Sequence, residues 1–524
     1  MSSLEDERTA MPLTPEAETL DEQTVEAVET RLLIDSGRTA TYENIAQPES
    51  LFSRRSRGNP IAPFLVVLLA FSGVFFYFFD RPSPKDWKAT EASLPRGATA
   101  AVAPTILISL DGFRHEYLSR KKKASTAFLA PTLHTLATKG VHAKGGMQPV
   151  VPTITFPNHW ALATGLYPES NGIVSNTMYD PVKKSWFHAD RVNPGWWFGE
   201  PVWQTLRRTL RKVKFSNGTQ ETLQQNYTTA SVFWPGSEVE KHAPDLFFKY
   251  DNTLPLHERV DRAVAALQGK NADLNREAQF VTLYFGDVDH EGHEHGPYSD
   301  EVTEAIERVD EALAYLLKSL GEDVAERYNV VVVSDHGMTT TSEERTIDLK
   351  HVLKEGTVQD VISSPMGLFM NESISAEELY STLKDGLKNE SEHVKVYRKA
   401  DLPERWHLSA SRLITPVVTM AALGWTVRYP HQHIVPDPDV SVRTPGTLHG
   451  QGDWETDPGS HGFDNTYEDM MAIFVARGPA FKGGTTVEGM RSIDVYEMLC
   501  NVFGATPAPN NGSLGVTMTS VLKG

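Results

Sequence analysis

Short apolar runs alternate with helix-like stretches over most of the chain. Four of these runs have the length of a strand, and each ends in polar or small residues: Thr105–Leu110, Phe280–Phe285, Asn329–Ser334 and Met470–Ala476. Strands without a polar face are typical of sheets that are covered on both sides, as parallel sheets are. The pattern therefore predicts buried strands in a mostly parallel sheet.

A long amphipathic segment between the second and third runs supports this interpretation. Over residues 301–320, one face of a helix with period 3.6 carries only apolar side chains: Val302, Ile306, Val309, Leu313, Leu316 and Leu320. Strands that alternate with crossover helices are the repeating unit of α/β proteins. We predict an α/β fold whose parallel-dominated sheet is sandwiched by helices, with ligands bound at the carboxyl ends of its strands.

The apolar segment Ile61–Phe79 has a different pattern, because it is uncharged and far longer than a strand. A helix over this segment spans roughly 28 Å, about the thickness of a hydrocarbon core. The segment lies far from Met1 and has no small-residue cleavage pattern, so a secretory leader is not expected. We predict one transmembrane helix over residues 60–80; a buried core helix is the alternative. Basic residues flank both ends, so they do not decide its orientation.

Glycosylation sequons indicate the orientation of this helix. N-x-S/T triplets occur only after it, and they begin at Asn217, Asn226, Asn371, Asn389 and Asn511. Such acceptors face the lumen or the cell exterior. The pattern predicts a single-pass type II membrane protein with a disordered cytosolic tail (residues 1–59), a stalk (81–103) and a large domain (104–524) that is lumenal, in the secretory pathway or vacuole, or extracellular.

Composition restricts the classes of function. The chain has 524 residues and a formal net charge of −18, so it is a poor general binder of nucleic acids. A ligand that carries phosphate would need a local positive centre, such as a metal ion. The single cysteine, Cys500, excludes a disulfide scaffold and a zinc finger within one chain.

Polar clusters near the predicted strands carry the candidate chemistry. Four of them stand out after the apolar runs: Asp111; Thr153, Thr155, Asn158 and His159 in PTITFPNH; Asp287, Asp289, His290, His293 and His295; and Asp335 with His336. A fifth is His461 with Asp464 in SHGFDN. Carboxylates and imidazoles bind zinc or similar divalent ions where thiolates are absent. One such residue is often only a cap, a turn or a packed side chain, but together these clusters predict a metal centre.

Seven motifs then follow one another in a distinctive order. They are LDGFRHEYL, TFPNHWALATGLYPESNGIVSNTMYD, FWPGSEVE, DVDHEGHEHGP, VVVVSDHGM, HGFDN and DVYEMLCNVFG. The series resembles the nucleotide pyrophosphatase/phosphodiesterase family of the alkaline phosphatase superfamily, from about Thr105 to the C-terminus. The resemblance implies an alkaline-phosphatase-like catalytic domain that uses two divalent metal ions, with zinc as the expected ion, and a threonine nucleophile.

The resemblance also implies roles for individual residues. One metal would be held by Asp111, Thr155, Asp335 and His336, and the other by Asp289, His293 and His461. Thr155 would also be the nucleophile, and Asn176 would donate a hydrogen bond to a phosphate oxygen. Phe156 and Tyr250 would stack on a nucleobase, with Asn158 as a further pocket residue. Asp287, His290 and His295 would lie outside the metal sites.

The implied chemistry suits these residue types. A threonine hydroxyl is a weak nucleophile, and a bound divalent cation lowers its pKa. A second cation stabilises the leaving side of an in-line displacement, and an amide donor stabilises charge that grows in the transition state. The resemblance therefore implies hydrolysis of nucleoside triphosphates and related phosphodiesters to nucleoside monophosphates. The reaction would pass through a covalent threonine intermediate that water then hydrolyses.

Some positions depart from the family pattern. Thr177 stands where the vertebrate members that hydrolyse nucleotides carry a lysine, and residues 286–288 read Gly-Asp-Val where Glu-Glu-Pro is common. Cysteine-rich modules and a nuclease-like domain are not found beside the catalytic motifs, so a minimal form is expected. These departures leave the substrate preference open.

Other functions remain as alternatives. The same two-metal site could serve a lysophospholipid or glycerophosphodiester phosphodiesterase, although the expected stacking residues favour a nucleotide. An inactive adhesion or receptor ectodomain would have lost a ligand or the nucleophile, and every one of these positions holds a competent residue. Monoester hydrolysis ranks low, because no additional basic residue is evident near Thr155. Oligomeric state and the partners of the acidic tail do not follow from the sequence.

Overall fold

The computed structural model describes the part of the chain that follows residue 101. The described residues are 102–189, 193–214, 220–224, 227–353, 359–362, 365–371, 373–428, 458–515, 519 and 521–523. Contacts separate Met1–Thr90 from Glu91–Gly524, and the described residues all belong to the second unit. The predicted tail, transmembrane helix and most of the stalk lie outside them. Among the residues that are described, no helix is both long enough and apolar enough to cross a membrane.

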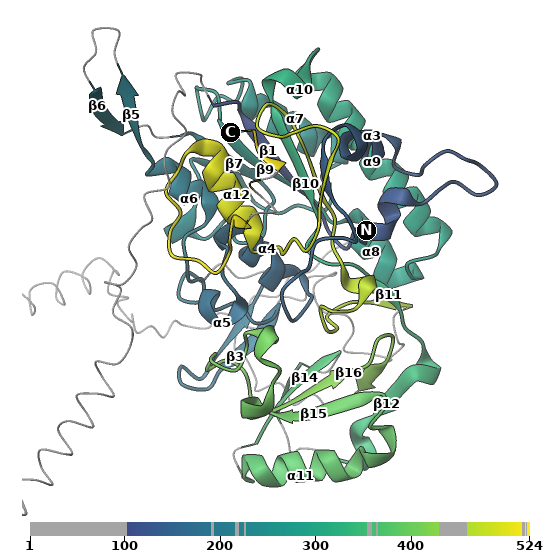
Figure 1. The fold of residues 1–524 in the computed structure, drawn as a ribbon. Helices are drawn as coiled ribbons and strands as arrows, with labels where there is room; N and C mark the ends of the chain where they lie inside the picture. Colours follow the sequence, from purple (N-terminus) through teal and green to yellow (C-terminus); the bar gives the residue numbers. More distant parts are fainter. Residues whose placement is uncertain are drawn as a thin grey trace, which may run out of the picture. The chain divides into compact units, whose positions relative to one another are not determined.

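The described part is built on an eight-stranded sheet with the strand order β20-β2-β19-β10-β1-β9-β7-β8 (Figure 1). In that order the strands span Thr485–Val487, Val141–Ala143, Phe474–Arg477, Asn329–Val333, Thr105–Leu110, Phe280–Phe285, Thr229–Val232 and Leu246–Phe248. Neighbouring strands run parallel except at β19, which is antiparallel to both β10 and β2. The predicted α/β fold with a mostly parallel sheet is confirmed.

Three of the four predicted strands form the centre of this sheet. The first three apolar runs become β1, β9 and β10, which are adjacent and buried along their whole length. The fourth run is different, because only its second half belongs to β19 and that strand is antiparallel. Met470 lies in a short 3₁₀ helix, and Ala472 bridges to Arg114 and Met147 instead. An apolar run indicates burial but not strand direction.

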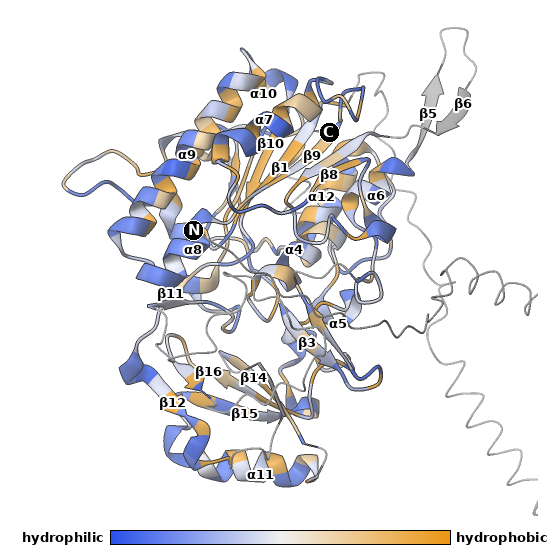
Figure 2. Cartoon of the chain, turned by 180° about the vertical axis from the view of Figure 1, so that it is seen from behind, coloured by the Kyte–Doolittle hydropathy of each residue, from blue (hydrophilic) through white to orange (hydrophobic). Residues whose placement is uncertain are grey.

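Helices cover both faces of the sheet, and successive strand residues enter two separate cores. Ile106 and Ile108 of β1 pack with one set of helices: α3 (Pro131–Lys139), α7 (Leu256–Leu267) and α9 (Asp300–Leu320). Leu107 packs with the other set: α4 (Thr155–Thr164), α6 (Val202–Arg207) and α12 (Asp494–Phe503). Burying each such side chain contributes about 1.5–3 kcal/mol. Figure 2 shows the apolar strands β1, β9 and β10 between these helices.

The predicted crossover helix is confirmed as α9. All six residues of its predicted apolar face are buried, and its first turn is capped by the Ser299 hydroxyl, which accepts a hydrogen bond from the Val302 amide. Shorter elements complete this part of the chain: α5 (Pro168–Asn171), α8 (Asp287–His295), α10 (Val324–Arg327) and the hairpins β3–β4 (Thr177–Asp180, Ser185–His188) and β5–β6 (Leu210–Lys214, Gln220–Gln224).

A second, smaller sheet was not predicted. It has the order β13-β14-β16-β15 (Gln359–Ile362, Met366–Met370, Val417–Ala421, Val394–Arg398), and every pairing is antiparallel. Helix α11 (Ala376–Gly386) covers it (Figure 1), and β12 (Thr346–Asp348) pairs with β17 (Thr426–Arg428) beside it. We call this region, residues 346–428, the small-sheet region. Two of its strands, β14 and β16, are largely apolar and buried, but the sequence analysis did not identify them.

Candidate metal centre and active site

The candidate site lies where three adjacent strands of the large sheet end. Asp111 follows β1, Asp335 and His336 follow β10, and α8 begins directly after β9 with Asp287. Because these strands are parallel neighbours, their carboxyl ends meet at one edge of the sheet. The sequence predicted this convergence, and the structure brings the three segments together.

A short pair of strands adds the fourth segment. Strand β11 (Thr339–Thr340) lies three residues after His336, and it pairs with β18 (Gly459–Ser460), which directly precedes His461. The rings of His336 and His461 stack with their centres 3.7 Å apart. Since β19 is antiparallel, the chain enters it from the same edge where β10 ends, and this places the SHGFDN segment at the site.

A glycine allows the segments to approach closely. Gly112 has a φ of +63°, and a Cβ atom at this position would lie 2.8 Å from Asp289 Oδ1 and 2.9 Å from Asp289 Cα. A side chain here would therefore clash with α8 and strain the backbone. The Gly112 amide also donates a hydrogen bond to Asp335 Oδ1 at 3.2 Å. Gly112, which follows β1, thus lies against the segment after β9 and donates to the segment after β10.

The first predicted ligand set surrounds one imidazole nitrogen. His336 Nε2 lies 3.0 Å from Asp335 Oδ2 and 3.5 Å from Asp111 Oδ1. The Thr155 hydroxyl oxygen lies 3.5 Å from the same nitrogen. Asp111, Asp335 and His336 are buried, and Thr155 begins α4 at the edge of this group. The structure brings these four residues together.

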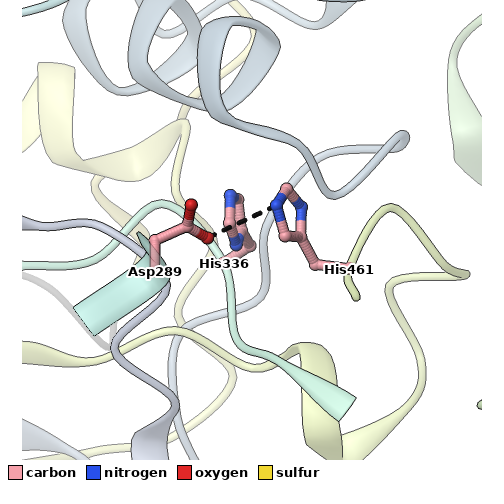
Figure 3. A group of neighbouring side chains, drawn as sticks. All are labelled: Asp289, His336 and His461. Atoms are coloured by element: carbon pink, nitrogen blue, oxygen red, sulfur yellow. Dashed lines mark ion pairs between the residues drawn. The ribbon is translucent and has the colours of Figure 1, made fainter. Parts of the chain in front are cut away.

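The second predicted set is equally compact. His293 Nε2 lies 2.9 Å from His461 Nε2 and 3.5 Å from Asp289 Oδ2. His461 Nε2 lies 3.4 Å from Asp289 Oδ1. Asp289 and His293 are one turn apart on α8, so a helix rather than a loop presents them. Figure 3 shows Asp289 facing His461, with the His336 ring beside them.

The three histidines of these sets share one hydrogen-bond arrangement. The Nδ1 atoms of His293, His336 and His461 lie 2.9–3.1 Å from the backbone carbonyls of Gly459, Gly337 and Thr153. A carbonyl only accepts hydrogen bonds, so each Nδ1 carries a proton, and in the neutral imidazole each Nε2 presents a lone pair. Backbone acceptors of this kind orient histidines that ligate metals.

The carboxylates present matching lone pairs. Three buried oxygens at this edge, among the residues described, have no hydrogen-bond donor: Asp111 Oδ1, Asp289 Oδ1 and Asp335 Oδ2. Each of them faces a histidine Nε2 at 3.0–3.5 Å. Lone pairs that converge in this way repel one another unless a cation lies between them. The donor set therefore fits divalent metal ions, and nitrogen and oxygen ligands without thiolate suit zinc.

Burial and charge also shift the pKa values at this site. Burial, together with the negative charges of Asp335 and Asp289, holds the pKa of Asp111 well above its usual value. Burial alone would also raise the pKa of Asp335, but His336 and His159 outweigh it and lower that pKa. Burial lowers the pKa of His461 well below its usual value, and the neighbouring His336 and His293 add to this effect. The groups thus depend strongly on one another's charge.

Thr155 and Asn176 are held together by the first turn of α4. The Asn176 side-chain oxygen accepts a hydrogen bond of 2.9 Å from the Phe156 amide. This contact leaves the Asn176 amino group as the donor of that side chain. The hydroxyl of this turn and an amide donor that is bonded to the turn therefore lie beside each other, as expected for a nucleophile and an oxyanion donor.

The proposed substrate residues have different surroundings. Phe156 is half-buried against Trp197, with ring centres 6.1 Å apart. Tyr250 is 51% exposed, and its ring packs on those of Phe233 and Tyr284. Both rings keep exposed surface, which stacking on a base requires.

Asn158 does not have the surroundings of a pocket residue. Its side chain is fully buried. Its oxygen accepts from the Val150 amide, and its amino group donates to the carbonyls of Pro152 and Ile154. The expectation that Asn158 contacts substrate is corrected: its polar atoms fix the segment that leads into α4.

The remaining residues of the predicted clusters lie outside the two sets. Asp287 faces Arg259, with an O–N distance of 3.7 Å. His290 and His295 are exposed and lie near glutamates of their own helix. Asp464 accepts hydrogen bonds from Arg405 and from the Trp406 indole. These residues are ordinary surface or structural side chains here.

Three of the predicted glycosylation positions lie in the described part of the chain. Asn389 and Asn511 are exposed, and Asn371 is half-buried. Asn217 and Asn226 lie outside the described residues. The accessible positions suit glycan attachment, which remains a prediction.

Sequence reasoning missed four contacts beneath the ligands. The Tyr284 hydroxyl donates a hydrogen bond of 2.6 Å to Asp111 Oδ2. His159 contacts both Thr155 and Asp335, and Ser109 contacts His159. His159 belonged to a predicted cluster without a role, and its signal was its spacing of one helical turn from Thr155. A tyrosine in an otherwise apolar strand was the signal for Tyr284.

An α/β sheet that gathers carboxylates, histidines and a threonine hydroxyl at its strand ends has the donor set of a metal-dependent hydrolase. Residues 105–464 match the family model described as type I phosphodiesterase/nucleotide pyrophosphatase. The chain belongs to this family of hydrolases. The family resemblance predicted from its motifs is therefore confirmed.

Individual relatives cover most of the chain. Ectonucleotide pyrophosphatase/phosphodiesterase family member 1 from Homo sapiens is 34% identical over 79% of this chain, but this chain covers only 41% of that protein. Bis(5'-adenosyl)-triphosphatase ENPP4 from Homo sapiens is 31% identical, and the match covers 86% of each chain.

A solved structure also resembles this chain. It is that of murine ectonucleotide pyrophosphatase/phosphodiesterase 5, an inactive threonine-to-alanine variant in complex with AMP. The TM-score is 0.66 at 28% sequence identity, and the match covers 80% of this chain and 100% of the other. Fold and sequence thus agree on the family.

Proposed function

We propose that this chain is a metal-dependent phosphodiesterase that hydrolyses nucleoside triphosphates and dinucleoside polyphosphates, and releases a nucleoside monophosphate. The observation that carries the proposal is the position of the Thr155 hydroxyl. It lies 3.5 Å from His336 Nε2, beside the buried carboxylates of Asp111 and Asp335.

In this proposal Thr155 is the nucleophile. Two bound divalent cations, with zinc as the expected ion, would lower the pKa of its hydroxyl and balance the charge of the substrate. Thr155 Oγ1 forms a bond to phosphorus while the bond to the leaving phosphate group breaks. Asn176 donates its amide hydrogen bond to the phosphate oxygen on which charge grows. Water then cleaves the phosphothreonine diester, which releases the nucleoside monophosphate and restores Thr155.

The proposed ligand sets are those of the sequence analysis. Asp111, Thr155, Asp335 and His336 would hold one cation, and Asp289, His293 and His461 the other. Proximity alone would also group His336 with Asp289 and His461, and His159 with Asp111 and Asp335. We prefer the first division, because it uses one Nε2 lone pair from each histidine and leaves out His159, whose two ring nitrogens are both engaged.

Relatives support a nucleotide substrate. One of them is named a bis(5'-adenosyl)-triphosphatase and matches over most of both chains. The solved neighbour contains AMP, and its inactive form lacks a threonine. The exposed ring of Tyr250 and the half-buried ring of Phe156 would stack on the base.

We also propose that the enzyme is anchored in a membrane. The uncharged segment Ile61–Phe79 would form a single type II span. The catalytic domain would then be glycosylated and face a lumen, in the secretory pathway or vacuole, or the cell exterior.

A substrate panel on the full-length protein in detergent tests the proposal. ATP, diadenosine triphosphate and glycerophosphocholine are compared at equal concentration, with zinc and after chelation. We expect AMP from both nucleotides and little cleavage of glycerophosphocholine. Chelation should abolish the activity, and added zinc should restore it. Cleavage of glycerophosphocholine without cleavage of either nucleotide would favour the lipid alternative, and full activity in chelator would contradict the metal-dependent mechanism.

A further inference from the structure

His159 differs from the other histidines at the site in how its ring is used. It is fully buried on α4, one turn after Thr155. Its Nδ1 lies 2.9 Å from the Thr155 carbonyl oxygen and its Nε2 lies 2.8 Å from the Ser109 hydroxyl. The carbonyl only accepts, so Nδ1 carries the proton and Nε2 accepts from Ser109. Neither nitrogen is left for a metal ion.

The protonated nitrogen of His159 faces two functional residues at once. Besides the Thr155 carbonyl, Nδ1 approaches Asp335 Oδ2 at 3.4 Å. That oxygen is the one that faces His336 Nε2 and that lacks a conventional hydrogen-bond partner among the described residues. One N–H group therefore touches both the turn that carries the nucleophile and a carboxylate of the first ligand set.

The ring of His159 is fixed by its neighbours. Trp234 and Tyr284 pack edge-on against it, with ring centres 5.1 Å and 5.3 Å away. Ser109 belongs to β1, two residues before Asp111. The Thr155 carbonyl sets the tautomer, and Ser109 at the centre of the sheet donates its hydroxyl hydrogen to the other ring nitrogen. A ring held in this way cannot turn to expose Nε2 to the site without breaking its contact with Ser109.

We propose that His159 is a positioning residue: its Nδ1–H sets the orientation of the Thr155 turn and of the Asp335 carboxylate toward the metal site. This inference rests on the proposed function, because it assigns His159 to the same nucleophile and ligand. Partners behind the ligands of a metal site commonly change metal affinity or activity by about 10–100-fold when they are removed. His159 acts here without touching substrate.

Two substitutions separate the ring nitrogens. The amino group of asparagine can occupy the place of Nδ1, whereas the terminal amide of glutamine reaches the place of Nε2. We expect His159→Asn to keep zinc affinity and kcat within about 3-fold of the wild type. We expect His159→Gln to lose about 10–100-fold in zinc affinity, measured by chelator competition, and a similar factor in kcat with little change in KM.

A matched control comes from another buried histidine. His242 contacts Gln204 and the Trp197 carbonyl through its two nitrogens, and it packs on Trp160 of the same helix α4. His242→Asn and His242→Gln should alter thermal unfolding but leave zinc affinity unchanged. If they lower zinc affinity as much as His159→Gln does, packing of α4 explains the effect and the inference is wrong.

Other outcomes are equally decisive. Equal zinc affinities for the wild type and both His159 variants would overturn the inference, as would an equal loss in both variants, or a loss in the asparagine variant alone. A wild-type protein that binds no zinc and cleaves no nucleotide would instead contradict the proposed function. The two failures are therefore distinguishable in one set of measurements.

Discussion

The candidate site lies at the carboxyl ends of β1, β9 and β10, which we call the catalytic edge of the large sheet. Charged side chains have different surroundings at this edge and in the small-sheet region. At the catalytic edge, Asp111 and Asp335 are buried and each has an oxygen without a hydrogen-bond donor among the described residues. In the small-sheet region, Glu377 accepts two hydrogen bonds from Arg398 at 2.6–2.7 Å, and both side chains are exposed. The core of that region is mostly apolar, and its buried polar side chains, Ser411, Thr415 and Thr419, are uncharged.

The difference indicates what each region is organised for. Buried carboxylates without donors oppose folding, because desolvation disfavours their charge. Such groups persist where a bound cation offsets their repulsion, and this is the expected state of the catalytic edge. Exposed, fully paired charges affect stability little. The residues of the small-sheet region thus suit a stable fold without a ligand, whereas those of the catalytic edge suit the binding of a cation.

The largest expected effect is that of removing the Thr155 hydroxyl. We expect Thr155→Ala to lower kcat on a nitrophenyl nucleotide ester by about 10³-fold or more, because the nucleophile is lost. Thr155→Ser keeps a hydroxyl and should retain most of the activity. Initial rates of the purified proteins in excess zinc measure both. A Thr155→Ala variant with wild-type kcat would mean that the catalytic edge is not organised around this hydroxyl.

The second prediction concerns a buried carboxylate. Asp111→Asn should weaken zinc binding by more than about 100-fold, because it removes a ligand rather than a partner behind one. In the metal-free protein the same change should be stabilising. The pKa of Asp111 is raised in the folded state, so its contribution favours folding below its unfolded pKa and is lost as pH rises through the folded value.

The direction in which Asp111 changes the stability of the metal-free protein can be measured directly. The unfolding temperature of chelated wild type should fall relative to that of chelated Asp111→Asn as pH rises from about 4 upward, with a gap of at least about 2 °C at neutral pH. In excess zinc the order should reverse, because only the wild type gains from binding. Glu377→Gln is the matched control: it removes an exposed carboxylate and should show neither the gap nor the reversal. A wild type more stable than Asp111→Asn without metal would refute the contrast.

Much of the catalytic edge could be predicted because its signals are local in the sequence. Runs without a polar face predicted β1, β9 and β10, and the polar residues directly after them predicted the ligands. Parallel neighbours must bring such residues to one edge, so no long-range contact had to be known. Motif order added His461, which no local pattern connects to β10.

The rest depended on contacts between distant segments. The direction of β19 follows from its pairing with β10 and β2, which its apolar run does not encode. Asn158 was expected in the pocket from its place in the motif, but its amide is bonded to Val150, Pro152 and Ile154. The tautomer of His159 follows from its contact with the Thr155 carbonyl, and Ser109 in β1 holds the other ring nitrogen. The small sheet depends on the antiparallel pairing of β16 with β14 and β15, which the apolar residues of these strands do not encode.

A smaller effect on zinc affinity is expected from a residue that contacts a metal ligand without being a ligand itself. Tyr284→Phe removes the hydroxyl that donates to Asp111 Oδ2 at 2.6 Å, and both residues are buried. Zinc affinity should fall by about 10-fold, because Asp111 loses the contact that turns its other oxygen toward His336. Chelator competition measures the change. Tyr315→Phe is a control, since that hydroxyl donates to the exposed Asp261, which belongs to neither ligand set. If both variants bind zinc like the wild type, Asp111 does not need orienting.

The smallest expected effect lies in the small-sheet region. Arg398→Ala removes the paired contact with Glu377 and the stacking of the guanidinium over Tyr380, at 3.7 Å from the ring centre. Because the pair is exposed to solvent, we expect the unfolding temperature to change by less than about 2 °C, and zinc affinity and kcat to remain at the wild-type level. The double variant with Glu377→Ala should behave like either single variant. A loss of kcat in Arg398→Ala would show that this surface is coupled to the catalytic edge, and that the two regions are not organised separately.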